Sequence, residues 1–162
     1  SSITANLDYL PPKQVSVDKQ VYTDSLLQQS HLKFELPRPL HDFEITYGND
    51  KGDSLKLGYT MQENVFYLDR THAGKSDFSD KFAEPVMKAP AHFKNDNTIE
   101  ISIFTDQSSI EFFADEGATV LTAQVFPNMP YNTLTIKTQD EAGNLKLAHV
   151  PSIWPTPNQK NN

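Results

Sequence analysis

The chain has 162 residues, of which 37% are hydrophobic and 10% aromatic, a composition typical of one globular domain with an adequate core. Its formal net charge of −7 disfavours nucleic acid and anionic membrane surfaces as partners, because both attract lysine- and arginine-rich faces. No apolar run approaches the ~18–20 residues that span a bilayer. The sequence contains no cysteine, which excludes a disulfide, a thiol nucleophile and a thiolate metal site and leaves the compartment open.

The first 14 residues are expected to form a linker or entry segment, since Pro11 and Pro12 cannot enter a helix interior or a central strand. A single domain is expected over residues 15–154, followed by a tail over residues 155–162. Residues 21–30 are the one stretch where we allow a helical turn, although a strand is favoured there too.

Apolar and polar residues then alternate with a period of two, which predicts strands rather than helices. The alternating runs are residues 31–36, 42–47, 55–59, 99–103 and 134–137. Residues typical of turns separate runs at 48–53, 115–117 and 140–144, where Gly and Asn supply the positive φ that hairpins need. Many short strands at this spacing predict an all-β domain, a two-sheet antiparallel β-sandwich of the jelly-roll or concanavalin-like kind.

One long irregular stretch is expected over residues 71–90, which include Gly74 and two prolines. Loops of that length are often functional or packed on a neighbour. We weigh a surface loop held by Phe78 and Phe82 equally against a role in contacting a partner.

Two predicted strands are apolar on both faces. Ile103 and Phe104 point to opposite sides of one strand, and Phe112 and Phe113 point to opposite sides of the next. A strand that is apolar on both faces is covered on both, whereas a two-layer sandwich covers only one. The pattern therefore predicts a neighbouring domain or a subunit contact on the second face.

Carboxylates are the residues best suited to catalysis here, because a pair that flanks a glycosidic bond can hydrolyse it. Asp106 and Glu111 lie on either side of a predicted tight connection, and Asp69 lies beside Arg70. A carboxylate beside serines in a turn more often accepts backbone N–H groups, so a structural role is favoured for Asp106 and Glu111. The five histidines are scattered without ligand spacing, which predicts no metal site.

The residues of segment 101–117 carry a recognisable pattern, Ile-Ser-Ile-Phe-Thr-Asp-Gln-Ser-Ser-Ile-Glu-Phe-Phe-Ala-Asp-Glu-Gly, followed by Leu121-Thr122 and Phe126-Pro127. This pattern resembles the C-terminal β-sandwich module of glycoside hydrolase family 32, the family of invertases, levanases and inulinases. The Asp-Arg pair at 69–70 matches a family strand, and residues 147–154 resemble its closing strand and Trp-bearing tail. Where the family often has Ser-Gly, this chain has Ala73-Gly74. The resemblance implies a structural or interface role for the motif residues Asp69, Arg70, Asp106, Ser108, Ser109, Glu111 and Phe113.

The same resemblance implies that the chain holds no catalytic residue, cofactor or metal. The family's Asn-Asp-Pro, Arg-Asp-Pro and Glu-Cys motifs lie in an N-terminal five-bladed propeller, and this sequence contains none of them. The implied function is a non-catalytic module that stabilises the propeller and shapes its substrate cleft, in the periplasm or outside the cell. Two alternatives stay open: a stand-alone fructan-binding module that uses aromatic side chains such as Phe104 and Trp154, and an oligomerisation module whose apolar face contacts a second copy.

Overall fold

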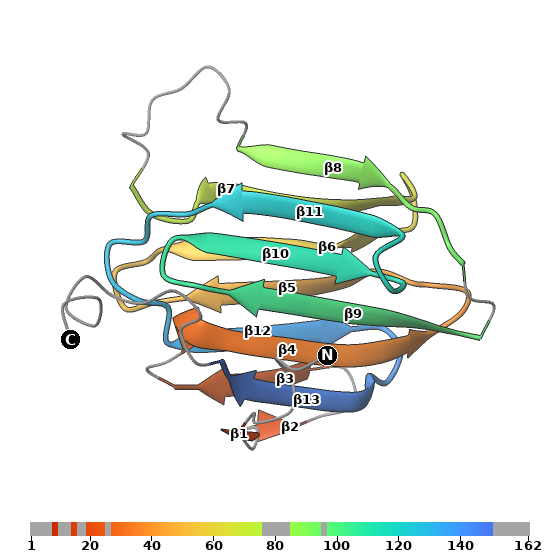
Figure 1. Ribbon diagram of the computed structural model, residues 1–162, viewed down its shortest axis with the longest axis horizontal. Helices are drawn as coiled ribbons and strands as arrows, with labels where there is room; N and C mark the ends of the chain where they lie inside the picture. The colour runs from red at the N-terminus through yellow and green to blue at the C-terminus, as the bar shows by residue number, and fades with distance from the viewer. Residues whose placement is uncertain are drawn as a thin grey trace, which may run out of the picture.

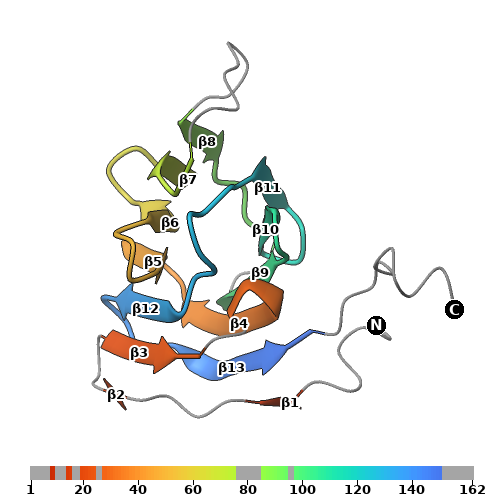
Figure 2. The same cartoon turned by 90° about the vertical axis from the view of Figure 1, so that its left-hand side faces the viewer.

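In the computed structural model the chain folds into two antiparallel sheets packed face to face (Figure 1). The structure describes residues 8–9, 14–15, 19–24, 27–75, 85–94 and 97–150. Seen from the side, the sheets form two layers (Figure 2). This architecture confirms the predicted all-β sandwich. Among the described residues there is no helix long and apolar enough to cross a membrane.

The strand order defines each layer. The six-stranded sheet runs β1 (Asp8–Tyr9), β13 (Gly143–His149), β4 (Ser30–Pro37), β9 (Thr98–Thr105), β10 (Ser109–Ala114) and β11 (Thr119–Gln124). The seven-stranded sheet runs β2 (Gln14–Val15), β3 (Lys19–Thr23), β12 (Thr133–Thr138), β5 (Phe43–Gly48), β6 (Ser54–Thr60), β7 (Val65–His72) and β8 (Val86–Pro90). Chain neighbours β9, β10 and β11 therefore lie side by side in one layer.

The core lies between the layers, where alternate residues of each strand point inward. Aromatic rings join the two sheets: Phe66 and Phe112 have ring centroids 5.5 Å apart, and Phe34 and Phe43 meet edge to face at 5.9 Å. Full burial of one such side chain contributes about 1.5–3 kcal/mol. The period of two in the sequence thus corresponds to one buried face on each sheet.

The turns between strands have the backbone conformations that their residues predict. Positive φ occurs at Gly52, Gly117 and Asn144, within the three predicted turn segments. In the turn between β10 and β11, Asp115 and Glu116 also adopt positive φ, at 55° and 56°. Glu116 and Gly117 are the central residues of a turn closed by a hydrogen bond from the Ala118 N–H to the Asp115 carbonyl at 3.1 Å, and two successive left-handed residues there support a tight reversal.

The expectation of an irregular stretch over residues 71–90 is wrong at both ends. Strand β7 continues to His72, and residues 86–90 form β8, which pairs with β7. Met87 and Ala89 pack against the core, while the alternate residues Val86, Lys88 and Pro90 are exposed. The strand was missed because it is short and ends in Pro90, which only an edge strand tolerates. Phe78 and Phe82 lie outside the described residues.

The N-terminal part of the chain contributes more structure than an entry segment implies. Asp8 and Tyr9 pair with His149 and Ala148 of β13 as strand β1. Residues 21–30 contain the end of β3 and a short 3₁₀ turn, η2 (Leu27–Gln29), before β4 begins. Residues 21–30 therefore contain both a strand and a helical turn, the two structures that the sequence allows there.

Candidate functional site

The motif carboxylate Asp106 lies in the tight connection between β9 and β10. Its Oδ1 accepts a hydrogen bond from the N–H of Gln107 at 2.7 Å, and its own N–H donates to the carbonyl of Ser109 at 2.9 Å. The carbonyl of Ser108 accepts from the N–H of Val125 at 3.0 Å, which joins this turn to the segment after β11. The Asp106 carboxylate is thus held by the backbone of its own turn, as expected of a turn residue.

A second group of motif residues meets at the same end of the sandwich. The Arg70 Nη1 atom donates to the carbonyl of Gln124 at 2.8 Å, and Asp69 Oδ1 accepts from the N–H of Thr71 at 2.9 Å. Gly74 follows, and a Cβ built there would lie 2.2 Å from the carbonyl oxygen of Phe126. Only glycine permits this approach, so the Asp-Arg strand and the Phe-Pro segment pack against each other directly.

Buried polar contacts fix the loops at this end. The Gln28 Nε2 donates to the carbonyl of Gln107 at 2.8 Å, and Gln28 Oε1 accepts from the N–H of Tyr131 at 2.8 Å. A hollow of about 420 Å³ opens beside them, with Gln29 and Phe126 among its lining residues. One buried amide in η2 therefore holds the loops after β9 and β11 in fixed relation to each other.

Asp53, in the turn between β5 and β6, ties that turn to the same loop region. Its carboxylate accepts hydrogen bonds from Asn49 Nδ2 at 2.8 Å, from the Asn128 N–H at 2.7 Å and from Asn128 Nδ2 at 2.9 Å. Burial by itself raises the pKa of Asp53, but these hydrogen bonds outweigh burial and hold the pKa below its usual value. No feature of the sequence pattern pointed to this carboxylate.

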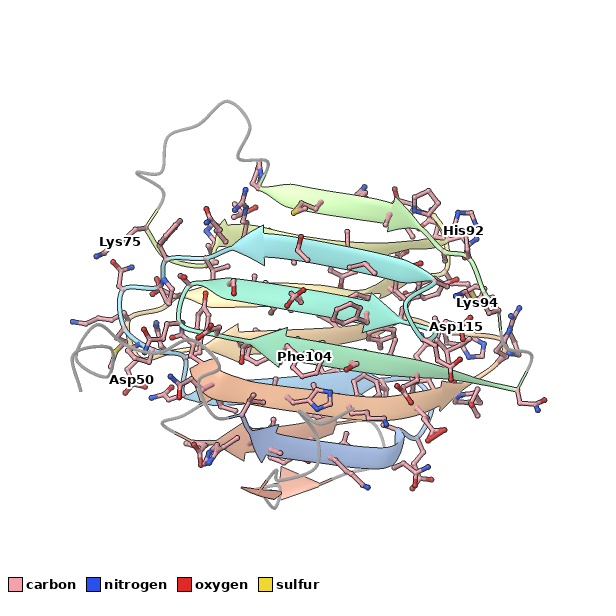
Figure 3. The ribbon with its side chains drawn as sticks, in the orientation of Figure 1. Asp50, Lys75, His92, Lys94, Phe104 and Asp115 are labelled. Carbon is pink, nitrogen blue, oxygen red and sulfur yellow. The ribbon has the colours of Figure 1, made fainter. Side chains whose placement is uncertain are left out.

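The outer face of the six-stranded sheet carries stacked rings. Phe104 lies parallel to the imidazole of His31, with ring centroids 4.0 Å apart and an interplanar angle of 3°. Phe113 meets Phe104 edge to face at 6.2 Å, and Figure 3 shows Phe104 on the face of β9 turned to the viewer. A shallow hollow of about 390 Å³ is lined by both phenylalanines, Glu100 and Glu116 among others. The second apolar face predicted for β9 and β10 is therefore present.

The imidazole of His31 is buried although it lies at an outward strand position, opposite Phe104. It is only 5% exposed, and its Nε2 is 2.7 Å from the Ser102 hydroxyl. Burial first and the neighbouring Lys33 second together lower the pKa of His31 to about 4. The ring is consequently neutral at pH 7 and serves as a flat support for Phe104.

Glu111, the other motif carboxylate, points outward from β10 and is exposed. Within the described ranges its carboxylate has no hydrogen-bond or ion-pair partner, and no group of three metal-ligating side chains occurs there. Asp106 and Glu111 thus differ in setting, one held in a turn and the other open on a sheet face. Trp154, the other candidate for a sugar or domain contact, lies outside the described residues.

The two-layer fold, together with the motif hairpin and its outward aromatic residues, defines a β-sandwich module. Residues 9–154 match the family model described as "Glycosyl hydrolases family 32 C terminal". Because this match covers most of the chain, the protein belongs to the family of C-terminal domains of family 32 glycosyl hydrolases. The resemblance to this family that the motif residues indicate is confirmed.

Individual relatives agree with this assignment. The chain is 40% identical over 72 residues to an extracellular exo-inulinase of Aspergillus awamori, covering 44% of this chain and 13% of that protein. It is 31% identical over 120 residues to a levanase of Bacillus sp. (strain L7), covering 73% of this chain and 13% of the levanase. The crystal structure of the exo-inulinase from Aspergillus awamori superposes with a TM-score of 0.69 at 23% identity, over 93% of this chain and 30% of the other. The chain therefore matches only a small part of each relative's length.

Proposed function

We propose that this chain is the non-catalytic C-terminal module of a fructan-degrading enzyme, in which it stabilises a separate catalytic β-propeller and shapes its substrate cleft. The observation that carries the proposal is the family match over residues 9–154, together with relatives named as exo-inulinase and levanase. The settings of the two motif carboxylates support a non-catalytic role. The Asp106 carboxylate accepts the backbone N–H of Gln107, and Glu111 is exposed on the sheet face without an ion-pair partner among the described residues.

The experiment compares the chain by itself with the protein in which the catalytic domain precedes it. Fructose release from inulin and from levan is measured for both, at equal molar concentration. We expect release only from the two-domain protein, and faster thermal inactivation of the catalytic domain when the module is removed. Fructose release by the chain alone at a rate comparable to that of the two-domain protein contradicts the proposal.

Fructan binding by the module itself is a second candidate function, favoured by the hollow that Phe104 and Phe113 line beside two carboxylates. Ring faces pack against the C–H side of sugars, and carboxylates accept hydrogen bonds from hydroxyl groups. Retardation of the chain in gels that contain levan, absent in gels with unrelated glycans, supports this function. If the Phe104→Ala variant is no longer retarded, the levan-binding site is assigned to this hollow.

Location outside the cytoplasm is part of the proposal, since three of the relatives with 39% identity and one with 40% are named extracellular. Fractionation of the source cells, with detection of the parent protein in the medium, tests it. Retention in the cytoplasm contradicts it.

A further inference from the structure

The two outer faces of the sandwich differ in chemistry. On the seven-stranded sheet, outward positions of adjacent strands carry Lys56, Thr46 and Thr135 in one row, and Tyr67 there donates its hydroxyl to Glu44 at 2.7 Å. Such a face is ordinarily solvated. The six-stranded sheet presents instead what we name the aromatic face, made of the outward side chains His31, Phe104, Glu111, Phe113, Val120 and Thr122.

The strand register makes the aromatic face continuous. His31 pairs with Phe104, Phe104 with Glu111, and Glu111 with Thr122, so one row crosses β4, β9, β10 and β11. In the next row Phe113 pairs with Val120. Directly opposed side chains in antiparallel strands lie about 5 Å apart, so each row is continuous across the sheet. The edge-to-face contact of Phe104 with Phe113 at 6.2 Å joins the two rows.

This face remains partly open in the chain alone. Val120 is 47% exposed although it lies within a strand, and Phe104 and Phe113 are half-buried. An exposed apolar patch rimmed by polar residues is the usual sign of an interaction site. The prediction of a second covered face, made from the sequence of β9 and β10, therefore extends to β11.

Charge decides which surface can cover the aromatic face. Glu100 is paired with Lys33 at 3.4 Å, whereas Glu111 and Glu116 have no cation opposite them among the described residues. A carboxylate that loses water without a cationic partner is strongly unfavourable, so the covering surface must carry arginine or lysine opposite Glu111. A second copy packed about a twofold axis would present only this same face, on which Lys33 is already paired with Glu100, and each copy has a net charge of −7.

We propose that the aromatic face is the surface on which the catalytic domain of the parent enzyme docks, with an apolar patch against Phe104, Phe113 and Val120 and a basic side chain against Glu111. The inference rests on the proposed function and deepens it by naming the face. It assigns to Glu111 and Phe113 of the family motif a role in the interface between the two domains.

The absence of cysteine from the sequence allows a direct test by thiol labelling. Val120→Cys places a single accessible thiol on the aromatic face, and Met61→Cys, at a position 51% exposed between β6 and β7, is the matched control. Maleimide labelling is followed at the peptide that contains each thiol, in the chain alone and in the two-domain protein. We expect labelling at position 120 to slow at least tenfold in the two-domain protein, with no change at position 61.

Equal labelling rates at position 120 in the two proteins overturn the inference. The inference is also overturned if labelling at position 120 slows in the chain alone as its concentration rises, because a second copy then covers the aromatic face. Protection in the chain alone by added levan or inulin overturns it as well, because it indicates a sugar site. Failure of the proposed function is seen separately, as absence of fructose release by the two-domain protein.

A charge reversal gives an independent measurement. Glu111→Lys should leave the unfolding of the chain alone almost unchanged, because this side chain is exposed, and should lower the Tm of the two-domain protein by roughly 2–8 °C. Glu141→Lys, an exposed acidic-to-basic reversal in the loop between β12 and β13, is the control and should change neither. Equal effects of the two reversals in the two-domain protein argue against docking on the aromatic face.

Discussion

The carboxylate of Asp53 offers the sharpest test of how the loops at one end of the sandwich are held. This side chain is 8% exposed and accepts three hydrogen bonds, one from Asn49 Nδ2 and two from the backbone and side chain of Asn128. Asp53→Asn keeps the shape of the side chain but replaces one acceptor oxygen by an NH₂ group. Donor then faces donor in at least one of the three contacts.

The size of the effect follows from these contacts. A hydrogen bond to a charged group contributes about 1.5–3 kcal/mol, and water can replace part of the loss because Asn128 is exposed. We therefore expect the free energy of unfolding to fall by about 2–3 kcal/mol, which corresponds to a Tm lower by roughly 4–12 °C. Asp50→Asn in the same turn is the control, since Asp50 is exposed and a substitution there should stay within about 0.5 kcal/mol.

The effect should also depend on pH. Because the folded-state pKa of Asp53 lies below the unfolded one, the carboxylate contributes stability above the unfolded pKa of about 3.9 and loses it as the pH falls through the folded pKa. Urea unfolding of wild type and Asp53→Asn is measured at pH 7 and in steps down to pH 3. The difference between them should shrink at the acid end. A difference that stays constant over this range, or one no larger than that of Asp50→Asn at pH 7, refutes the reasoning.

Three further predictions concern the core and the aromatic face. Phe112→Ala removes a fully buried ring and should cost about 3–5 kcal/mol in urea unfolding, and a loss below 1 kcal/mol would contradict its central place in the core. Gly58→Ala should cost about 1–3 kcal/mol, because the new Cβ would lie 2.2 Å from a backbone oxygen, whereas Gly143→Ala meets nothing nearer than 3.8 Å and should cost much less. The pKa of His31 is lowered to about 4 by burial first and by Lys33 second, so stability should fall as the pH drops from about 6.5 towards that value. An NMR titration in which this ring protonates near pH 6.5 would contradict the burial of His31.

The fold class could be predicted because each half-buried strand repeats its pattern locally. Alternation such as that of Ile99, Ile101 and Ile103 needs no knowledge of the partner strand to indicate a buried face. The outward position of Phe104 and Phe113 could be predicted from the sequence for the same reason. Strand β8 was missed because its pairing partner β7 and its packing on the core, not its own five residues, stabilise it.

The polar contacts of the candidate site were not predictable in the same way. The carboxylate of Asp53 and the amide donors of Asn128 are separated by 75 residues, and only the fold brings them together. Gly74 is needed because Phe126 passes beside it, and no local signal reports that approach. His31 sits at an outward strand position, where the pattern indicates exposure.

The sequence by itself determined that the chain is an all-β sandwich of one family, because strand periodicity and the motif from Asp106 to Phe113 are local properties of consecutive residues. Tertiary structure alone decided which of those residues share a surface. Register between β4, β9, β10 and β11 places His31, Phe104 and Val120 on one face, since side chains of different strands become neighbours only when the strands pair.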